Sequence, residues 1–161
     1  MLPLDGVTIL DLTQVQAGPS CTQLLAWLGA QVIKIEEPGK GDRTRWEMAD
    51  KENSDSFYFL VFNSNKKSMT LNLKNKEGVS ILNRLLKISD VIIENYAPGR
   101  MDEFGLSKQY ISKNFPHVVY ASIKGFGNSG PNSYLKSYEH VAQAAGGAMS
   151  TNGVTEGPPL F

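Results

Sequence analysis

The sequence predicts a protein of the α/β class, with a parallel sheet flanked by helices. Short apolar runs rich in β-branched residues alternate along the chain with segments whose apolar residues recur every three or four positions. Gly and Pro stand at many of the joins. The 161 residues, 41% of them hydrophobic and 20% charged, suit one domain with a core of its own.

The first predicted elements are a strand, a helix and a second strand. Residues 7–12 (VTILDL) form a short apolar run typical of a buried strand. Gly18-Pro19 precedes a helix over 20–28, because Pro is tolerated in a first turn, and Gly29 suits its end. Residues 31–36 (QVIKIE) predict the second strand.

The middle of the chain begins with a polar stretch over 37–55, which predicts a long loop. Residues 57–62 are apolar, and their pattern leaves helix or strand open. Alternation over 68–73 predicts a strand, and an apolar stripe over 75–88 predicts a helix. Residues 90–96 (DVIIENY) predict another buried strand.

The last part of the chain continues the alternation. Short helices are expected over 101–104 and 107–114, followed by a strand over 117–123 (HVVYASI). Residues 138–149 have a helical pattern that Gly146-Gly147 weakens. Strand and helix repeated in this way predict a Rossmann-like parallel sheet flanked by helices.

Composition excludes several classes of protein. Sixteen basic residues balance sixteen acidic ones, so we expect no nucleic-acid partner. The single Cys21 forms no internal disulfide and no multi-cysteine metal site, and we expect no metal. No membrane-length apolar run or signal peptide is visible, so we expect a cytoplasmic protein with no membrane partner. Phosphate-loop, zinc-protease, serine-esterase and dinucleotide fingerprints are absent.

Ligands of parallel α/β sheets bind beyond the carboxyl ends of the strands. This rule selects residues 13–19, 37–45, 94–99 and 124–130. The helix start that follows residues 14–19 attracts anions, or this stretch is a plain strand-to-helix turn. Two groups of basic residues are interpreted either as phosphate contacts or as solvated charges: Lys40, Arg43 and Arg45 in the polar loop, and Lys66 and Lys67 before the third strand.

Several long blocks resemble the family III CoA-transferases. They are PLDGVTILDLTQVQAGPSCTQLLAWLGAQVIKIEEPGKGDRTR, ENYAPGRMDEFGL, VVYASIKGFGNSGP and YEHVAQAAGGAMSTNG. They run in family order through nearly the whole chain. VQAGPSCTQ, DSFYFLVFNSNKKSMTLNLK, LKSYEHVAQAAGG and EGPPL are most similar to the branch that uses formyl-CoA and oxalate.

The resemblance implies an enzyme that moves CoA between carboxylic acids, with formyl-CoA and oxalate as the leading pair. A family aspartate attacks an acyl-CoA to give a mixed anhydride, and the CoA thiolate returns to make an enzyme thioester. No cofactor is permanently bound, and the CoA thioester is a substrate. The partners implied are acyl-CoA, a small carboxylic acid and a second copy of the chain in an interlocked homodimer.

The resemblance also implies site residues. Gln16, Tyr138 and Glu139 would support catalysis, the last beside the nucleophile. Twelve positions would contact CoA: Gln16, Ala17, Leu71, Asn72, Leu73, Lys74, Asn95, Tyr96, Ala97, Lys136, Ser137 and Tyr138.

The sequence departs from the family pattern at three places. The nucleophilic aspartate follows the EGPPL block in the family, so it is expected beyond residue 161 and no carboxylate here inherits its role. Residues 1–161 are therefore expected to be the N-terminal part of the large domain, truncated and inactive alone. Formyl-CoA members often carry arginine where this chain has Glu37, and a second family arginine is replaced by Glu103, with Arg100 nearby.

Other functions stay open on the sequence. A family member with a different acid pair, or an acyl-CoA racemase, would share the CoA contacts. A non-catalytic CoA-binding remnant fits the missing nucleophile. A nicotinamide-dependent dehydrogenase domain is indicated only by the alternation of strands and helices, and its glycine fingerprint is absent.

Overall fold

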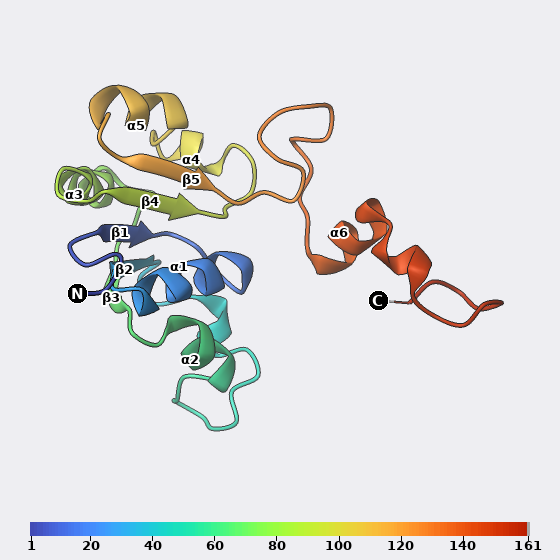
Figure 1. Ribbon diagram of the computed structural model, residues 1–161. Helices are drawn as coiled ribbons and strands as arrows, with labels where there is room; N and C mark the ends of the chain where they lie inside the picture. The colour runs from blue at the N-terminus through green and yellow to red at the C-terminus, as the bar shows by residue number, and fades with distance from the viewer. Residues whose placement is uncertain (161) are drawn as a thin grey trace. The chain divides into compact units, whose positions relative to one another are not determined.

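The chain is described by a computed structural model that covers residues 1–160. It divides into two compact units, Met1–Ile123 and Lys124–Phe161. The first unit holds the parallel sheet that the sequence predicted (Figure 1). The sheet has five strands in the order β3-β2-β1-β4-β5. The strands are β1 (Thr8–Asp11), β2 (Gln31–Glu36), β3 (Lys67–Thr70), β4 (Val91–Glu94) and β5 (Val119–Ser122).

Helices and one 3-10 turn connect these strands. They are α1 (Ala17–Trp27), η1 (Arg43–Arg45), α2 (Phe57–Asn63), α3 (Lys76–Leu86), α4 (Arg100–Glu103) and α5 (Lys108–Asn114). Three of the helices begin at a side-chain cap, because an oxygen of Ser56, Asn75 or Ser107 accepts a backbone N–H of the first turn. The short polar residues before each apolar stripe therefore fix where these helices start.

The two faces of the sheet carry separate apolar cores. Successive strand residues point to opposite faces. Ile9 and Ile93 pack with Ala26 of α1 on one face, while Leu10 and Ile92 pack on the other with residues of the remaining helices. The second core includes Leu82 and Leu86 of α3, Met101 of α4 and Ile111 of α5. Both faces are covered by helices, as a parallel sheet requires.

Several predicted boundaries need correction. The strand expected over 68–73 ends at Thr70, because the Asn72 side chain accepts the Lys74 N–H at 3.0 Å and turns the chain. The helix expected over 20–28 already begins at Ala17. The undecided segment 57–62 is the helix α2, and the loop over 37–55 contains η1.

The second unit contains α6 (Glu139–Gly146) and η2 (Ala148–Thr151), and none of residues 124–160 is buried. The helix predicted over 138–149 is too long, because Gly147 adopts a left-handed conformation with φ of 84° and ends it. Across residues 1–160, no helix combines the length and apolar character that crossing a bilayer needs.

Candidate functional site: a pocket at the carboxyl ends of the strands

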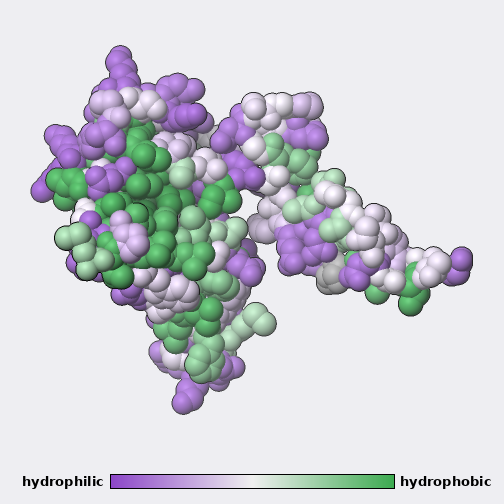
Figure 2. All heavy atoms as spheres, viewed as in Figure 1, coloured by the Kyte–Doolittle hydropathy of each residue, from purple (hydrophilic) through white to green (hydrophobic). Residues whose placement is uncertain are grey.

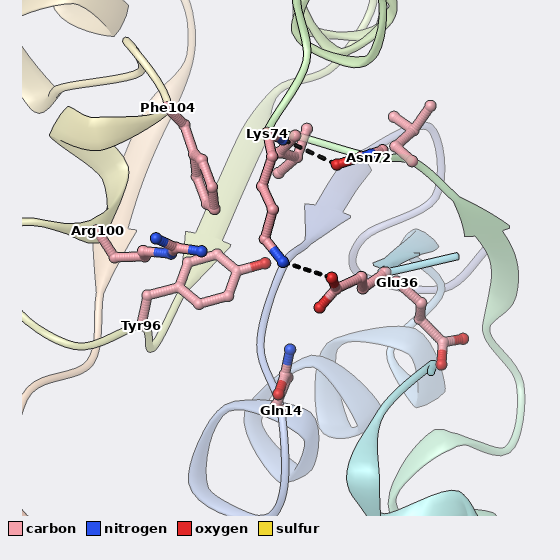
Figure 3. Close-up of a pocket in the computed structure, with 10 residues that line it drawn as sticks. Gln14, Glu36, Asn72, Lys74, Tyr96, Arg100 and Phe104 are labelled. Carbon is pink, nitrogen blue, oxygen red and sulfur yellow. Dashed lines mark hydrogen bonds and ion pairs between the residues drawn. The ribbon is translucent and has the colours of Figure 1, made fainter. Parts of the chain in front are cut away.

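A pocket of about 60 Å³ lies at the carboxyl edge of the sheet in the first unit (Figure 3). Its walls come from segments that follow four strands and from α4. They are Gln14, Glu36, Glu37, Leu71, Asn72, Leu73, Lys74, Tyr96, Arg100 and Phe104. The chain runs outward from β1 in opposite directions, to β2 and β3 on one side and to β4 and β5 on the other. Such a switch point is where open α/β sheets bind ligands.

A second hollow, of about 310 Å³, shares Leu73, Lys74 and Phe104 with the pocket. It continues along the first turns of α3, past Asn75, Lys76 and Ser80. The two hollows together offer an elongated ligand both a polar helix start and an aromatic wall.

Two cations and two aromatic rings shape the pocket. The Lys74 ammonium donates to a carboxylate oxygen of Glu37 at 2.6 Å, and Arg100 pairs with Glu103. The Arg100 guanidinium carbon also lies 4.6 Å from the centre of the Phe104 ring. Tyr96 meets Phe104 edge to face, with ring centres 5.8 Å apart. A phosphate and a flat or apolar group would both find partners here.

The pocket tyrosine remains protonated at neutral pH. Burial, and then the charge of Glu94, raise the pKa of Tyr96 to about 12. Its side chain therefore keeps its hydroxyl proton over the range in which enzymes work.

The Asn95 side chain joins the ends of β1 and β4. Its oxygen accepts the Gln14 N–H at 2.9 Å, and its amide nitrogen donates to the Gln14 carbonyl at 2.8 Å. Both polar atoms of the side chain are thus engaged with the backbone. The resemblance implied a CoA contact for Asn95, and the structure gives its side chain this bridging role.

The turn between β1 and α1 is held in a strained conformation. Val15 has φ of 70°, a region that β-branched residues rarely adopt. Its N–H lies 3.3 Å from both carboxylate oxygens of Asp42, which also forms a buried 2.9 Å ion pair with Lys34. A Cβ on Gly18 would lie 2.2 Å from the Thr13 Cβ, so only glycine lets the helix start this close to the strand. With the turn in this conformation, Gln16, which directly precedes α1, and Ala17, its first residue, are exposed.

Two basic residues considered for phosphate binding are used inside the fold. Arg45 donates to Glu36 at 2.7 and 2.8 Å and pairs with Asp55. The Lys66 ammonium is buried and lies 3.0 Å from Asp11. Burial opposes the charge of Asp11, but the cations of Lys34 and Lys66 outweigh it and lower the pKa of this carboxyl. The Arg45 contacts hold the loop that follows β2, and the Lys66 contact ties the residue before β3 to the end of β1. Neither interpretation from the sequence therefore describes the two residues.

The structure brings together five of the residues that the sequence singled out. Leu71, Asn72, Leu73, Lys74 and Tyr96 line the pocket. Gln16, Ala17 and Ala97 are exposed and lie outside its lining.

The four remaining positions belong to the second unit. Lys136, Tyr138 and Glu139 are exposed, and Ser137 is half-buried. Glu139 accepts a hydrogen bond from Gln143 at 2.9 Å, one turn along α6.

Five lining residues were not chosen as site residues from the sequence: Gln14, Glu36, Glu37, Arg100 and Phe104. The carboxyl-end rule had marked 13–19 and 37–45, so the signal for Gln14 and Glu37 was present. Phe104 lies on the turn after α4, and its place in the pocket depends on tertiary packing. Among residues 1–160, no three His, Cys, Asp or Glu side chains are grouped to hold a metal ion.

Known proteins resemble the chain in sequence. The pattern of CoA-transferase family III matches residues 4–161. A protein named formyl-CoA:oxalate CoA-transferase from Escherichia coli O139:H28 is 49% identical over 158 residues, which are 98% of this chain. One of the same name from Shigella boydii serotype 18 has the same identity. The chain spans 38% of the length of these relatives.

Solved structures also resemble the chain. A CAIB/BAIF family protein from Brucella suis superposes with a TM-score of 0.91 at 35% identity, covering 99% of this chain and 43% of that protein. A hypothetical protein from Mycobacterium tuberculosis superposes with a TM-score of 0.89 at 34% identity, covering 99% of this chain and 44% of that protein. With a pocket at the switch point, a matching fold and a family pattern over nearly every residue, the chain belongs to CoA-transferase family III.

Proposed function

We propose that this chain supplies the CoA site of an enzyme that moves CoA from formyl-CoA to oxalate. The observation that carries the proposal is the 49% identity, over 98% of the chain, to proteins named for that reaction. The pocket supports it, because Lys74 and Arg100 offer cations to phosphates while Tyr96 and Phe104 offer apolar surface. A CoA thioester combines these two kinds of chemistry in one elongated molecule.

Each part of the ligand has a proposed partner. The residues from Leu71 to Lys74 contact the adenosine and phosphate end, and Tyr96 and Ala97 contact the middle of CoA. Gln16 and Ala17 stand at the start of α1, where backbone N–H groups attract the negative charge that develops on a reacting carbonyl. For the second unit, we propose that CoA is contacted by Lys136, Ser137 and Tyr138. Glu139 orients the nucleophile.

The proposed chemistry is covalent and requires a nucleophilic aspartate outside these 161 residues. Its carboxylate attacks the formyl-CoA carbonyl and expels the CoA thiolate, leaving a mixed anhydride. The thiolate attacks the aspartyl carbonyl and releases formate, leaving an enzyme thioester. Oxalate takes over the acyl position by the same two steps in reverse and leaves as oxalyl-CoA. The residues described here bind and orient CoA in this scheme.

The proposed enzyme works as an interlocked homodimer. Large apolar side chains are exposed on two neighbouring helices, Trp27 at 58% on α1 and Phe57 at 70% on α2. Apolar residues also gather on the face of the molecule shown in Figure 2. Exposed apolar surface of this kind is typical of an interface.

Titration calorimetry with CoA tests the binding role. We expect the 161-residue protein to bind CoA, and Lys74→Met to weaken binding by about tenfold, because a charge-assisted contact to phosphate contributes roughly 1.5 kcal/mol. Lys87→Met, which removes an exposed lysine outside the pocket, is the matched control and should leave the affinity unchanged. Absence of CoA binding by the unaltered protein would refute the proposal.

Turnover is tested separately. We expect no transfer from formyl-CoA to oxalate by the 161 residues alone, and transfer by a protein that extends through the family aspartate. Mass spectrometry of the products distinguishes oxalate from other acceptors. Transfer only to a different acid, or racemisation of an acyl-CoA, would assign the chain to another branch of the family.

A further inference from the structure

The Lys74 cation of the pocket already pairs with a carboxylate of the chain. The Lys74 side chain reaches across the pocket (Figure 3). Its ammonium donates to a carboxylate oxygen of Glu37 at 2.6 Å, and the Lys40 ammonium lies 3.6 Å from the same oxygen. Lys74 follows β3 and Glu37 follows β2, so the pair links two neighbouring strand ends above the pocket.

The position of this pair does not suit a structural role. The side chains of Lys74 and Glu37 are 50% and 37% exposed, and ion pairs at such exposure add little to stability. By contrast, the ion pairs of Lys34 with Asp42 and of Lys66 with Asp11 are buried. Among the described lining residues, Glu37 therefore pairs with a cation of the pocket and takes no part in the buried ion pairs.

The neighbouring carboxylate is excluded as the competing group. Glu36 also lines the pocket, but its two oxygens accept hydrogen bonds from Arg45, Ser68 and the Asp42 N–H. Glu37 is ionised at neutral pH, because the hydrogen bond from Lys74 lowers its pKa. A phosphate oxygen approaching Lys74 would have to replace this carboxylate.

We propose that Glu37 is a specificity-determining residue that occupies Lys74 in place of a ligand phosphate and must be displaced before a phosphate-bearing ligand binds. The inference rests on the proposed CoA site. It adds that an anionic ligand must break the Lys74–Glu37 ion pair, which lowers its net binding free energy. The contribution of Lys74 to the binding free energy is then the free energy of its contact with phosphate minus that of its contact with the Glu37 carboxylate. The penalty is largest for ligands with the most phosphate charge at this point.

The test compares charge-neutralised variants by titration calorimetry with CoA and with adenosine 3′,5′-bisphosphate. We expect Glu37→Gln to tighten the binding of both by about two- to fivefold, the range set by a partly exposed ion pair. The gain should shrink as salt is raised, because screening weakens the competing pair. Glu47→Gln is the matched control, since it removes one charge and one ion pair, with Arg43, outside the pocket lining.

A double variant identifies the competition itself. In the Lys74→Met background, Glu37→Gln should give no gain, because the contested cation is gone. A gain that persists there, or one that Glu47→Gln reproduces, would show a general charge effect and overturn the inference. If the unaltered protein binds CoA and Glu37→Gln binds it equally well, the inference fails while the CoA site stands. If no variant binds either ligand, both fail.

Discussion

The Glu36 carboxylate shows how a single side chain organises the end of a strand. It accepts hydrogen bonds from Arg45 at 2.7 and 2.8 Å, from Ser68 at 2.6 Å and from the Asp42 N–H at 2.8 Å. Burial opposes its ionisation, but these donors outweigh burial and lower the pKa of Glu36 to about 2. The negative charge is therefore part of the folded state.

Acid should destabilise the protein through this residue. The pKa of Glu36 falls from 4.5 to about 2 on folding, so its contribution is fully present above pH 4.5 and is lost as the pH falls towards 2. By linkage, the shift corresponds to about 3 kcal/mol of unfolding free energy. Urea unfolding between pH 6 and pH 2 measures it. Glu36→Gln should flatten that dependence, and an equally steep slope in the variant would assign the effect to other carboxyls such as Asp11.

Residue roles were harder to predict than residue positions. Both Asn95 and Lys74 lie at the carboxyl edge of the sheet that the sequence selected for ligands, Asn95 directly after β4 and Lys74 in the turn between β3 and α3. Their partners, the Gln14 backbone and the Glu37 carboxylate, come from other strands, and only the register of the sheet brings them together. Local sequence carries no information about contacts across 81 and 37 residues.

Elements were predictable where their signal is local. The bounds of β2 agree with prediction, because 31–36 carries the β-branched residues Val32, Ile33 and Ile35 and begins after a glycine-ended helix. β3 was predicted three residues too long at its end, because the apolar residues Leu71 and Leu73 continue the alternation beyond the last strand residue and are buried in the turn. The alternation of apolar residues along the sequence indicates which side chains are buried, but it does not distinguish a strand from a buried turn.

The helix α3 offers a test of one apolar stripe. Leu82 is fully buried in the core between α3 and the sheet, whereas Ile88, just past the helix, is 72% exposed. We expect Leu82→Ala to lower the unfolding free energy by about 3 kcal/mol through lost burial and a cavity. Ile88→Ala should change it by less than about 0.5 kcal/mol. Urea denaturation compares the two, and equal losses would contradict this packing of α3.

At the scale of the whole molecule, the two units differ in their burial. Both apolar cores are built from residues between Met1 and Ile123. Residues 124–160 include α6, yet none of them is buried. Their backbone is held by local turns, α6 and η2, so their resistance to opening should be low.

Limited proteolysis of the 161-residue protein should reflect this difference. We expect trypsin to cut first at Lys136, which is exposed in the second unit. Lys51 is also exposed, but its loop is tied by the Arg45–Asp55 ion pair at 2.9 Å. Mass spectrometry of the early fragments identifies the cut. A first cleavage at Lys51 would contradict the expected order.

The Asn95 side chain carries a consequence for how the pocket changes between variants. Its two hydrogen bonds to the Gln14 backbone extend the pairing of β1 with β4 beyond the strands, with a side-chain amide in the place of a peptide group. Changing Asn95 to Asp replaces one donor by an acceptor, and the carboxylate would then face the Gln14 carbonyl. Asn95 belongs to neither apolar core, so a change at this position would act on the pocket edge of the sheet and leave both cores intact.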